Sequence, residues 1–437
     1  MPRIYSAILI TLFSLLYSCN TSTSNTQTSM SDSIHIDTTS AISYDSTFKV
    51  QAQSFADIQV LRYQVPGFDQ LPLQQKQLAY YLSEAALAGR DIYYDQKSKY
   101  GIMIRKTLEN MYGTFSGDKN SNDWKKFQTY CGRFWFSYGY HHHYNNNKFF
   151  PECSADYFLK VANASDTTSF PKDSTETVKA FLQRVKTLIY DPKIEPKLVN
   201  LSPNIDNVVA SSVNFYEGVT QKEVEDFYSK FDSKGNEPMW GLNSKVVKEN
   251  GQVVEKVWRL NGMYSSAIQK IIEWLDKAVT VAENSQQKTA LQLLSQYYKT
   301  GDLKTFDDYN IAWVKDTASR LDAVNGFIEV YDDPLARKGS FESIVSMKDI
   351  EASKKINAIA NQAQWFEDHS PLMPEHKKKN VKGIIAKAIT VIMESGGGGP
   401  SSSIGINLPN NEWIRKEVGS KSVSQSNIVQ SYNVDNA

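Results

Sequence analysis

Apolar residues recur every three or four positions in three parts of the chain, which is the spacing of a helix with one buried face. The first part is Leu71–Leu87, which Gly89 should end. The second is Ser98–Tyr112, with its serine as the expected N-cap and Gly113 as the expected stop. The third is Thr177–Ile189, whose apolar face is the most continuous.

Other helices are predicted from capping, charge and termination signals. Thr220 opens a segment in which Glu223 occupies the capping-box position, and Gly301 follows a long helical pattern. The charged stretch Met347–Asn380 also has helical character, and its lysine run at 377–379 is typical of a solvated face. The expected helices of this group are Thr220–Phe231, Ser265–Ala282 and Gln286–Tyr298.

Strand signals are fewer. Two valine-containing runs, 244–250 and 252–260, meet at Asn250-Gly251, a dipeptide that favours the turn of a β-hairpin. The segment 208–219 is β-branched and aromatic, which indicates strand and turn. Because helix outweighs strand, we predict an α+β fold that is predominantly helical.

The stretch GGGGPSSSIGINLPNNEWIR at 396–415 raises the question of a phosphate-binding loop. Such a loop needs a lysine after its last glycine, whereas Pro400 follows here and lacks a backbone donor. A dinucleotide-binding fingerprint also fails, because no Gly-x-Gly-x-x-Gly opens a helix. We therefore exclude nucleotide binding at this stretch.

The segment after the glycines predicts a short strand instead. Ile404, Ile406 and Leu408 alternate with small or polar residues, and Pro409 places the strand at a sheet edge or at its end.

This strand has two interpretations. Gly405 would let another backbone approach, and the side-chain amides of Asn407 and Asn410 could fix the register of an extended peptide added to the edge. The alternative is a structural strand end at which Asn410 begins a turn.

Composition narrows the class of protein only slightly. The 437 residues are 41% hydrophobic and 22% charged with a formal net charge of zero, so no basic footprint for nucleic acid is present. Three cysteines are too few for a disulfide framework. Cys131 and Cys153 would either pair in an oxidising compartment or remain buried thiols.

The N-terminus has the pattern of a processed leader. Residues 1–19 combine a basic start, a short apolar run and Leu-Tyr-Ser-Cys, which resembles a bacterial lipobox with Cys19 as the lipidated residue. An ordinary secretory signal with a chance cysteine is the alternative. Residues 20–45 are polar and Ser/Thr-rich, which predicts a disordered tether between a membrane anchor and the folded part, expected to start near Phe55. The implied location is the bacterial cell envelope.

Several motifs together resemble the dipeptidyl peptidase III family, M49, of zinc metallopeptidases. They are FWFSYGYHHHY at 134–144, NGFIEVYDDPLARKGSFESIV at 325–345, WFEDHSP at 365–371 and GINLPNNEWIRKEVGSKSVSQSNIV at 405–429. The resemblance implies a bilobal enzyme whose lower lobe surrounds a five-stranded, barrel-like mixed sheet. It assigns 46–344 and 384–437 to that lobe and 345–383 to an excursion into a helical, zinc-bearing upper lobe.

The resemblance also implies how a short peptide with a free N-terminus binds. The peptide would lie as an added strand against Ile404–Leu408, with Asn407 and Asn410 holding its N-terminal end. Asp322 matches the acidic residue that binds the peptide's ammonium group. Val324 stands where many members have a tyrosine that assists at the scissile carbonyl, which puts that assistance in doubt.

The family's zinc motif, His-Glu-x-x-Gly-His, is not found at any of the six histidines. The adjacent residues His141–His143 are interpreted as a structural cluster, and we expect no catalytic residue and no zinc site in this chain. We expect a fragment that lacks most of the upper lobe. Its function would be that of a zinc dipeptidyl peptidase, inactive by itself, or alternatively of a non-catalytic, lipid-anchored peptide-binding protein. A non-functional product that aggregates through its exposed lobe interface is the third possibility.

Overall fold

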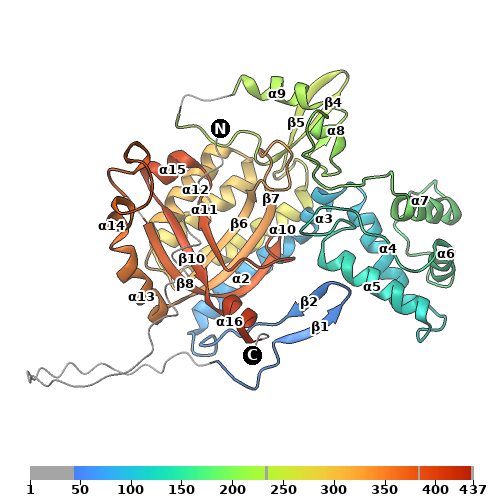
Figure 1. The fold of residues 1–437 in the computed structure, drawn as a ribbon, viewed down its shortest axis with the longest axis horizontal. Coiled ribbons are helices and arrows are strands. Elements are labelled where there is room, and N and C mark those ends of the chain that lie inside the picture. Colours follow the sequence, from blue (N-terminus) through green and yellow to red (C-terminus); the bar gives the residue numbers. More distant parts are fainter. Residues whose placement is uncertain (1–43, 232–234, 382–383, 435–437) are drawn as a thin grey trace, which may run out of the picture. The chain divides into compact units, whose positions relative to one another are not determined.

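The computed structural model describes residues 44–231, 235–381 and 384–434, in which one five-stranded sheet and two smaller sheets are surrounded by helices (Figure 1). The strands are β1 (Gln51–Phe55), β2 (Ile58–Leu61), β3 (Tyr216–Glu217), β4 (Ser244–Glu249), β5 (Gln252–Val257), β6 (Leu321–Glu329), β7 (Ser340–Asp349), β8 (Ile384–Gly396), β9 (Gly405–Leu408) and β10 (Ser420–Gln425). The helices are α2 (Leu73–Ala88), α3 (Arg90–Lys97), α4 (Gly101–Thr114), α5 (Asn122–Phe136), α6 (Ala155–Asn163), α7 (Val178–Tyr190), α8 (Asn207–Ala210), α9 (Gln221–Ser229), α10 (Ser265–Thr280), α11 (Ser285–Thr300), α12 (Leu303–Lys315), α13 (Ile350–Ala360), α14 (Ala363–Asp368), the 3-10 helix η2 (Pro374–His376), α15 (Glu412–Glu417) and α16 (Ser426–Val434).

The five-stranded sheet has the order β6-β7-β8-β10-β9. The strand pairs are antiparallel except for β8 and β10, which run parallel. Within the described parts of the chain, β6 and β9 each have one β-partner and form the two edges. The edge position predicted for 404–408 is therefore confirmed.

The sheet is open, which corrects the expected barrel-like closure. The edge strand β6 is linked to the β10-β9 side of the sheet by side chains and not by a ladder of backbone hydrogen bonds. Lys421 of β10 pairs with Asp322 of β6 at 2.8 Å, and Asn410 donates to Glu329 of β6 at 3.1 Å. Closure would need a longer β9. Pro409 follows this four-residue strand directly and has no N–H to continue a ladder.

Helices α2, α10, α11 and α12 pack beside one another, and α2 contacts the sheet at β6, β7 and β8 (Figure 1). Their apolar faces and the sheet share one core, in which Leu78, Ile271 and Val345 are completely buried. A second core lies among α4, α5, α6 and α7, and a small third one lies between α9 and β4.

Predictions from local signals were largely confirmed. Asn250 and Gly251 have φ values of 50° and 80° in the turn between β4 and β5, as the hairpin signal requires. Thr220 and Glu223 form the complete capping box of α9, and Thr177 caps α7.

Other local predictions were wrong. The N-cap of α4 is Tyr100, while the Ser98 hydroxyl accepts a hydrogen bond from the Tyr100 amide, and Gly113 lies inside the helix rather than after it. Residues 347–349 continue β7, because pairing with β6 and β8 overrode the local helical pattern there. The start of 208–219 is helical in α8. By contrast, the expected start of the folded part near Phe55 agrees with β1, the first described strand, which ends at that residue.

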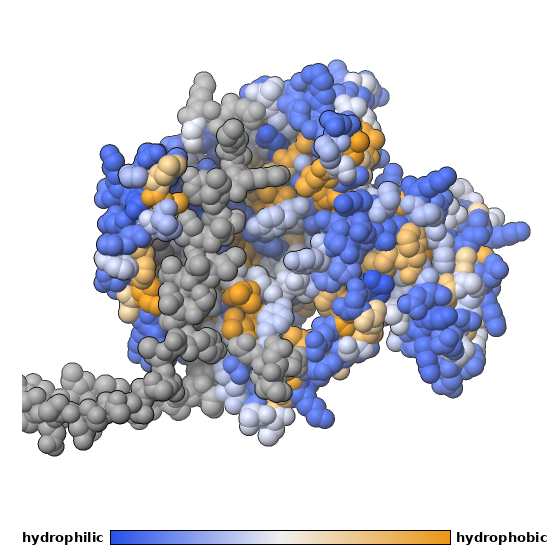
Figure 2. Space-filling view, viewed as in Figure 1, coloured by the Kyte–Doolittle hydropathy of each residue, from blue (hydrophilic) through white to orange (hydrophobic). Residues whose placement is uncertain are grey.

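The described surface is mostly hydrophilic on the face shown in Figure 2, with smaller hydrophobic patches between the polar side chains. Across 44–231, 235–381 and 384–434, the helices lack the combination of length and apolar character that crossing a bilayer would require. Cys19 and residues 20–43 of the predicted tether lie outside the described residues. The lobe boundaries stay predictions.

Candidate functional site

The free edge of β9 carries backbone groups without strand partners. The amide of Gln425 donates to the carbonyl of Ile404 at 2.9 Å, which makes these two residues a hydrogen-bonded pair of the antiparallel ladder. Because hydrogen-bonded and non-hydrogen-bonded pairs alternate, the pairs at Gly405 and Asn407 are of the other kind. The N–H and C=O groups of these two residues therefore point away from β10, toward the free edge.

Gly405 is exposed, and its lack of a side chain serves the contact with β10. A Cβ atom there would stand 2.9 Å from the carbonyl oxygen of Val423. The close backbone approach expected at this glycine is thus made by the neighbouring strand, and it leaves the outer side of the backbone uncovered.

One of the two polar atoms of the Asn407 side chain forms a hydrogen bond within the sheet. Its Oδ1 accepts a hydrogen bond from the Ser422 hydroxyl at 3.1 Å. Its Nδ2 has no hydrogen-bond partner among the described residues, so a donor remains beside the outward backbone groups.

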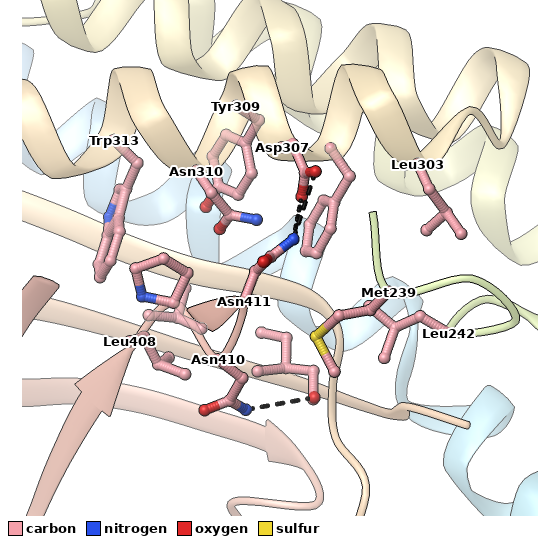
Figure 3. Close-up of a pocket in the computed structure, with 14 residues that line it drawn as sticks. Met239, Leu242, Leu303, Asp307, Tyr309, Asn310, Trp313, Leu408, Asn410 and Asn411 are labelled. Carbon is pink, nitrogen blue, oxygen red and sulfur yellow. Dashed lines mark hydrogen bonds between the residues drawn. The ribbon is translucent and has the colours of Figure 1, made fainter. Parts of the chain in front are cut away.

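Asn410 lies two residues beyond β9 and points toward the end of β6 (Figure 3). Its Nδ2 donates to the Glu329 carboxylate at 3.1 Å, with the Ile328 carbonyl at 3.5 Å. The sequence prediction brought Gly405, Asn407 and Asn410 to one edge, and the structure places all three there.

A pocket adjoins this edge, between α12, β6 and the segment after β9 (Figure 3). Its lining is mainly apolar and comprises Met239, Leu242, Leu303, Phe306, Asp307, Tyr309, Asn310, Trp313, Val324, Ile328, Leu408, Pro409, Asn410 and Asn411. Apolar pockets with a few polar groups are the usual form of a ligand site. Val324, where the family often has a tyrosine, is one of the apolar wall residues.

Asp307 and Asn411 form the polar contact of this pocket. The Asn411 Nδ2 donates to the Asp307 carboxylate at 3.1 Å, and its Oδ1 caps α15 by accepting from the Trp413 amide. Burial raises the pKa of Asp307 to about 6, although the Asn411 hydrogen bond acts in the opposite direction. The sequence analysis identified neither residue. The one available signal was Asn411 followed by Glu412, which is a typical N-cap pattern at the start of a helix such as α15.

Asp322 is already paired in this structure. One carboxylate oxygen accepts from the buried Lys421 ammonium group at 2.8 Å, and the other accepts from the Trp313 indole N–H at 2.7 Å. The Lys421 ammonium also lies 4.2 Å from the centre of the Trp313 ring. The ammonium-binding role expected for Asp322 stays a prediction, and a peptide would have to share this carboxylate with Lys421.

The three adjacent histidines make contacts within the fold. His141 is completely buried, with its Nε2 2.8 Å from the Glu195 carbonyl, and burial lowers its pKa to about 3. His142 lies 3.2 Å from Asp57, and His143 stacks on His142. These contacts hold the cluster within the fold, while the buried Nδ1 of His141 has no hydrogen-bond partner among the described residues.

The buried cysteines Cys131 and Cys153 are free thiols. Burial raises the pKa of both thiols, which makes them poor nucleophiles.

The fold as a whole is similar to that of two solved structures. Dipeptidyl peptidase III structures from Caldithrix abyssi and from Corallococcus sp. strain EGB superpose with TM-scores of 0.60 and 0.61, at 19% and 18% identity. They cover 84% and 85% of this chain, which in each case matches 57% of the solved chain.

Sequence comparison then gives the family. The family model "Peptidase family M49" matches residues 161–437, more than half of the chain, which therefore belongs to this family. Dipeptidyl peptidase 3 of Dictyostelium discoideum is 22% identical over 390 residues, which is 83% of this chain and 54% of the relative. Dipeptidyl peptidase 3 of Rattus norvegicus is 30% identical over 171 residues, or 38% of this chain and 22% of the relative. The chain thus matches about half the length of the Dictyostelium relative and about a fifth of the length of the rat relative.

Family M49 is generally zinc-dependent, so we tested whether this chain's donors fit zinc. In the part of the chain that the structure describes, no group of three or more His, Cys, Asp or Glu side chains is placed to hold a metal ion. The described residues therefore do not fit zinc, and no catalytic step is assigned to it here.

Proposed function

We propose that this chain provides the peptide-binding surface of an M49 dipeptidyl peptidase, a class that removes dipeptides from peptide N-termini. The single observation that carries the proposal is the free edge of β9, where Gly405 and Asn407 direct backbone groups outward. An extended peptide added there gains main-chain hydrogen bonds from both residues. Asn407 and Asn410 then supply amides for its N-terminal end, as the family resemblance implies.

The direction of the peptide follows from this arrangement. Asn410 comes after β9 along the chain, so a peptide with its N-terminus at Asn410 runs antiparallel to β9. Its first side chain would lie beside the apolar pocket at Leu408 and Val324. Short peptides with a free N-terminus are accordingly the proposed ligands.

Calorimetric titration of the purified chain with penta-alanine tests this proposal. We expect binding that Asn407→Ala weakens by roughly 5-fold to 10-fold, because one hydrogen bond contributes about 1 kcal/mol. Asn361→Ala, at the end of α13, is the matched control and should bind like the unchanged chain. A folded sample that binds no peptide would contradict the proposal.

The hydrolytic step is proposed to need groups outside these 437 residues. Support comes from the sequence, in which none of the six histidines is followed by glutamate. We expect no release of naphthylamine from a dipeptidyl-naphthylamide with added zinc, and zinc-dependent turnover would refute this. Peptide binding without catalysis is the alternative function, and the same β9 edge supports it.

A lipid anchor at Cys19 is proposed from the leader pattern alone. In bacterial cells, Cys19→Ser should move the chain out of the membrane fraction and abolish incorporation of labelled palmitate. Cys153→Ser is the control, because that cysteine is buried in the fold.

A further inference from the structure

We propose that the outer face of α2 is the contact surface between two copies of this chain, which pair with their α2 helices antiparallel. The surface consists of Leu73, Tyr80 and Leu87, with Lys76 and Glu84 between them, and is called the α2 seam below. The proposal does not depend on the peptide site, because the two surfaces share no residue.

Helix α2 carries apolar side chains on two opposite faces. The inner face, which includes Leu78 and Leu82, is buried in the core shared with the sheet. On the outer face, Leu73, Tyr80 and Leu87 are 71%, 54% and 42% exposed. The outer face of a surface helix is normally polar, so these three large apolar side chains indicate a face that a partner covers.

The three exposed side chains lie in one line along the helix. They are spaced seven residues apart, and seven residues return an α-helix to within about 20° of the starting direction. With a rise of 1.5 Å per residue, the line from Leu73 to Leu87 is about 21 Å long. Trp274 of α10 extends the apolar surface beside it, with its ring edge-on to that of Tyr80 at 5.7 Å between ring centres.

The charges of α2 favour a second copy in the antiparallel orientation. Lys76 and Glu84 are the two charged residues of this helix, and they lie four positions to either side of Tyr80. If two copies pair with Tyr80 on the two-fold axis, Lys76 of each copy stands level with Glu84 of the other, and Leu73 stands level with Leu87. A parallel pairing would instead bring like charges together, so the seam is self-complementary in one orientation.

Both charged groups are available for this contact. In the described parts of the chain neither forms an ion pair, and the Lys76 ammonium group donates to the Asp69 carbonyl at 2.8 Å. A two-fold interface uses each contact twice, so every dimer would contain a Lys76–Glu84 pair on both sides of the axis. One pair of helices buries less surface than most stable complexes do, and we therefore expect a dissociation constant in the micromolar range.

Sedimentation equilibrium of the whole chain, at concentrations from roughly 1 to 200 μM, measures the association. We expect an equilibrium between monomer and dimer. Leu73→Gln should weaken it by roughly 10-fold or more, because each dimer loses two apolar contacts. Leu201→Gln is the matched control, since Leu201 is 62% exposed outside α2, and it should associate like the unchanged chain.

Exchange of the two charges tests the orientation. Lys76→Glu and Glu84→Lys should each weaken association by roughly 10-fold, because attraction becomes repulsion on both sides of the axis. The double variant should associate like the unchanged chain, and so should an equimolar mixture of the two single variants. Restoration by the double variant also excludes misfolding as the cause of the single losses.

Three outcomes would overturn the inference. The first is a chain that stays monomeric at every concentration, including one whose Leu73 instead mediates binding to phosphatidylglycerol vesicles, which would assign the seam to a membrane surface. The second is association that Leu73→Gln leaves unchanged. The third is a double charge variant that associates as weakly as the single variants, which would exclude the antiparallel pairing.

Discussion

At the scale of single residues, the pocket buries the carboxyl group of Asp307, whose ionised form is unfavourable for folding. An aspartate ordinarily titrates near 3.8, and burial raises the pKa of Asp307 to about 6. Between these values the native state holds the proton more tightly than the unfolded state does. Its contribution to the free energy of unfolding therefore falls as the pH rises from about 4 to about 6, and then stays constant.

Replacing this carboxyl group should remove that dependence. We expect the free energy of unfolding of Asp307→Asn, relative to the unchanged chain, to rise by up to roughly 3 kcal/mol between pH 4 and pH 7. Urea unfolding at intervals of one pH unit measures it. Asp308→Asn is the matched control, because its side chain is exposed on the same helix. A difference for Asp307→Asn that is equal at every pH would contradict the assignment.

Single residues of the site were predictable where the signal was local. Gly405, Asn407 and Asn410 lie within six positions, so alternation and one proline were enough to place them on an edge. The partners of the two polar contacts were not predictable, because Asn410 and Glu329 are separated by 81 positions and Asn411 and Asp307 by 104. Only the folded sheet brings them together.

At the scale of elements, the difference between local signals and contacts formed only in the fold explains which strands were not predicted. Strands β6 and β7 carry polar residues that are completely or almost completely buried, such as Asn325 and Ser343. Their side chains bond to each other and to the Val324 carbonyl, so burial on both faces removed the alternation that signals a strand. The β4–β5 hairpin was found because its turn is specified by two adjacent residues.

Two glycines, Gly251 predicted in a hairpin turn and Gly113 predicted as a helix stop, should respond oppositely to the same substitution. Gly251 has φ of 80° in the hairpin turn, so Gly251→Ala should lower the free energy of unfolding by about 1 kcal/mol. Gly113 lies inside α4, and a Cβ atom there would meet nothing within 4 Å. Gly113→Ala should therefore raise the free energy of unfolding by roughly 0.5–1 kcal/mol.

Urea unfolding of the two variants in one buffer measures both effects. The pair controls for any general effect of adding a methyl group. Destabilisation by Gly113→Ala would show that α4 ends before this residue, as the sequence alone suggested.

At the scale of the whole molecule, the resemblance to family M49 predicted more of the fold than the hydrophobic and polar pattern did. It indicated the five-stranded sheet, which periodicity alone did not reveal. The family model and the solved structures agree with the resemblance to this family. It did not anticipate that the sheet stays open. That outcome depends on the length of β9 and on Pro409, and on side chains such as Lys421 that bridge the remaining distance.

The central claim is that a peptide binds as an added strand on the free edge of β9. An added antiparallel strand forms main-chain hydrogen bonds through every second residue, because only Gly405 and Asn407 face it. The peptide's amide groups should therefore fall into two classes, those that bond to β9 and those that point away from it.

Calorimetric titration with a series of penta-alanines, each methylated at one backbone nitrogen, tests this claim most directly. We predict a period of two along the peptide, with losses of roughly 10-fold or more at alternate positions from the lost hydrogen bond and the added bulk, and small changes between them. Equal affinity across the series, or losses that do not alternate, would contradict binding by strand addition.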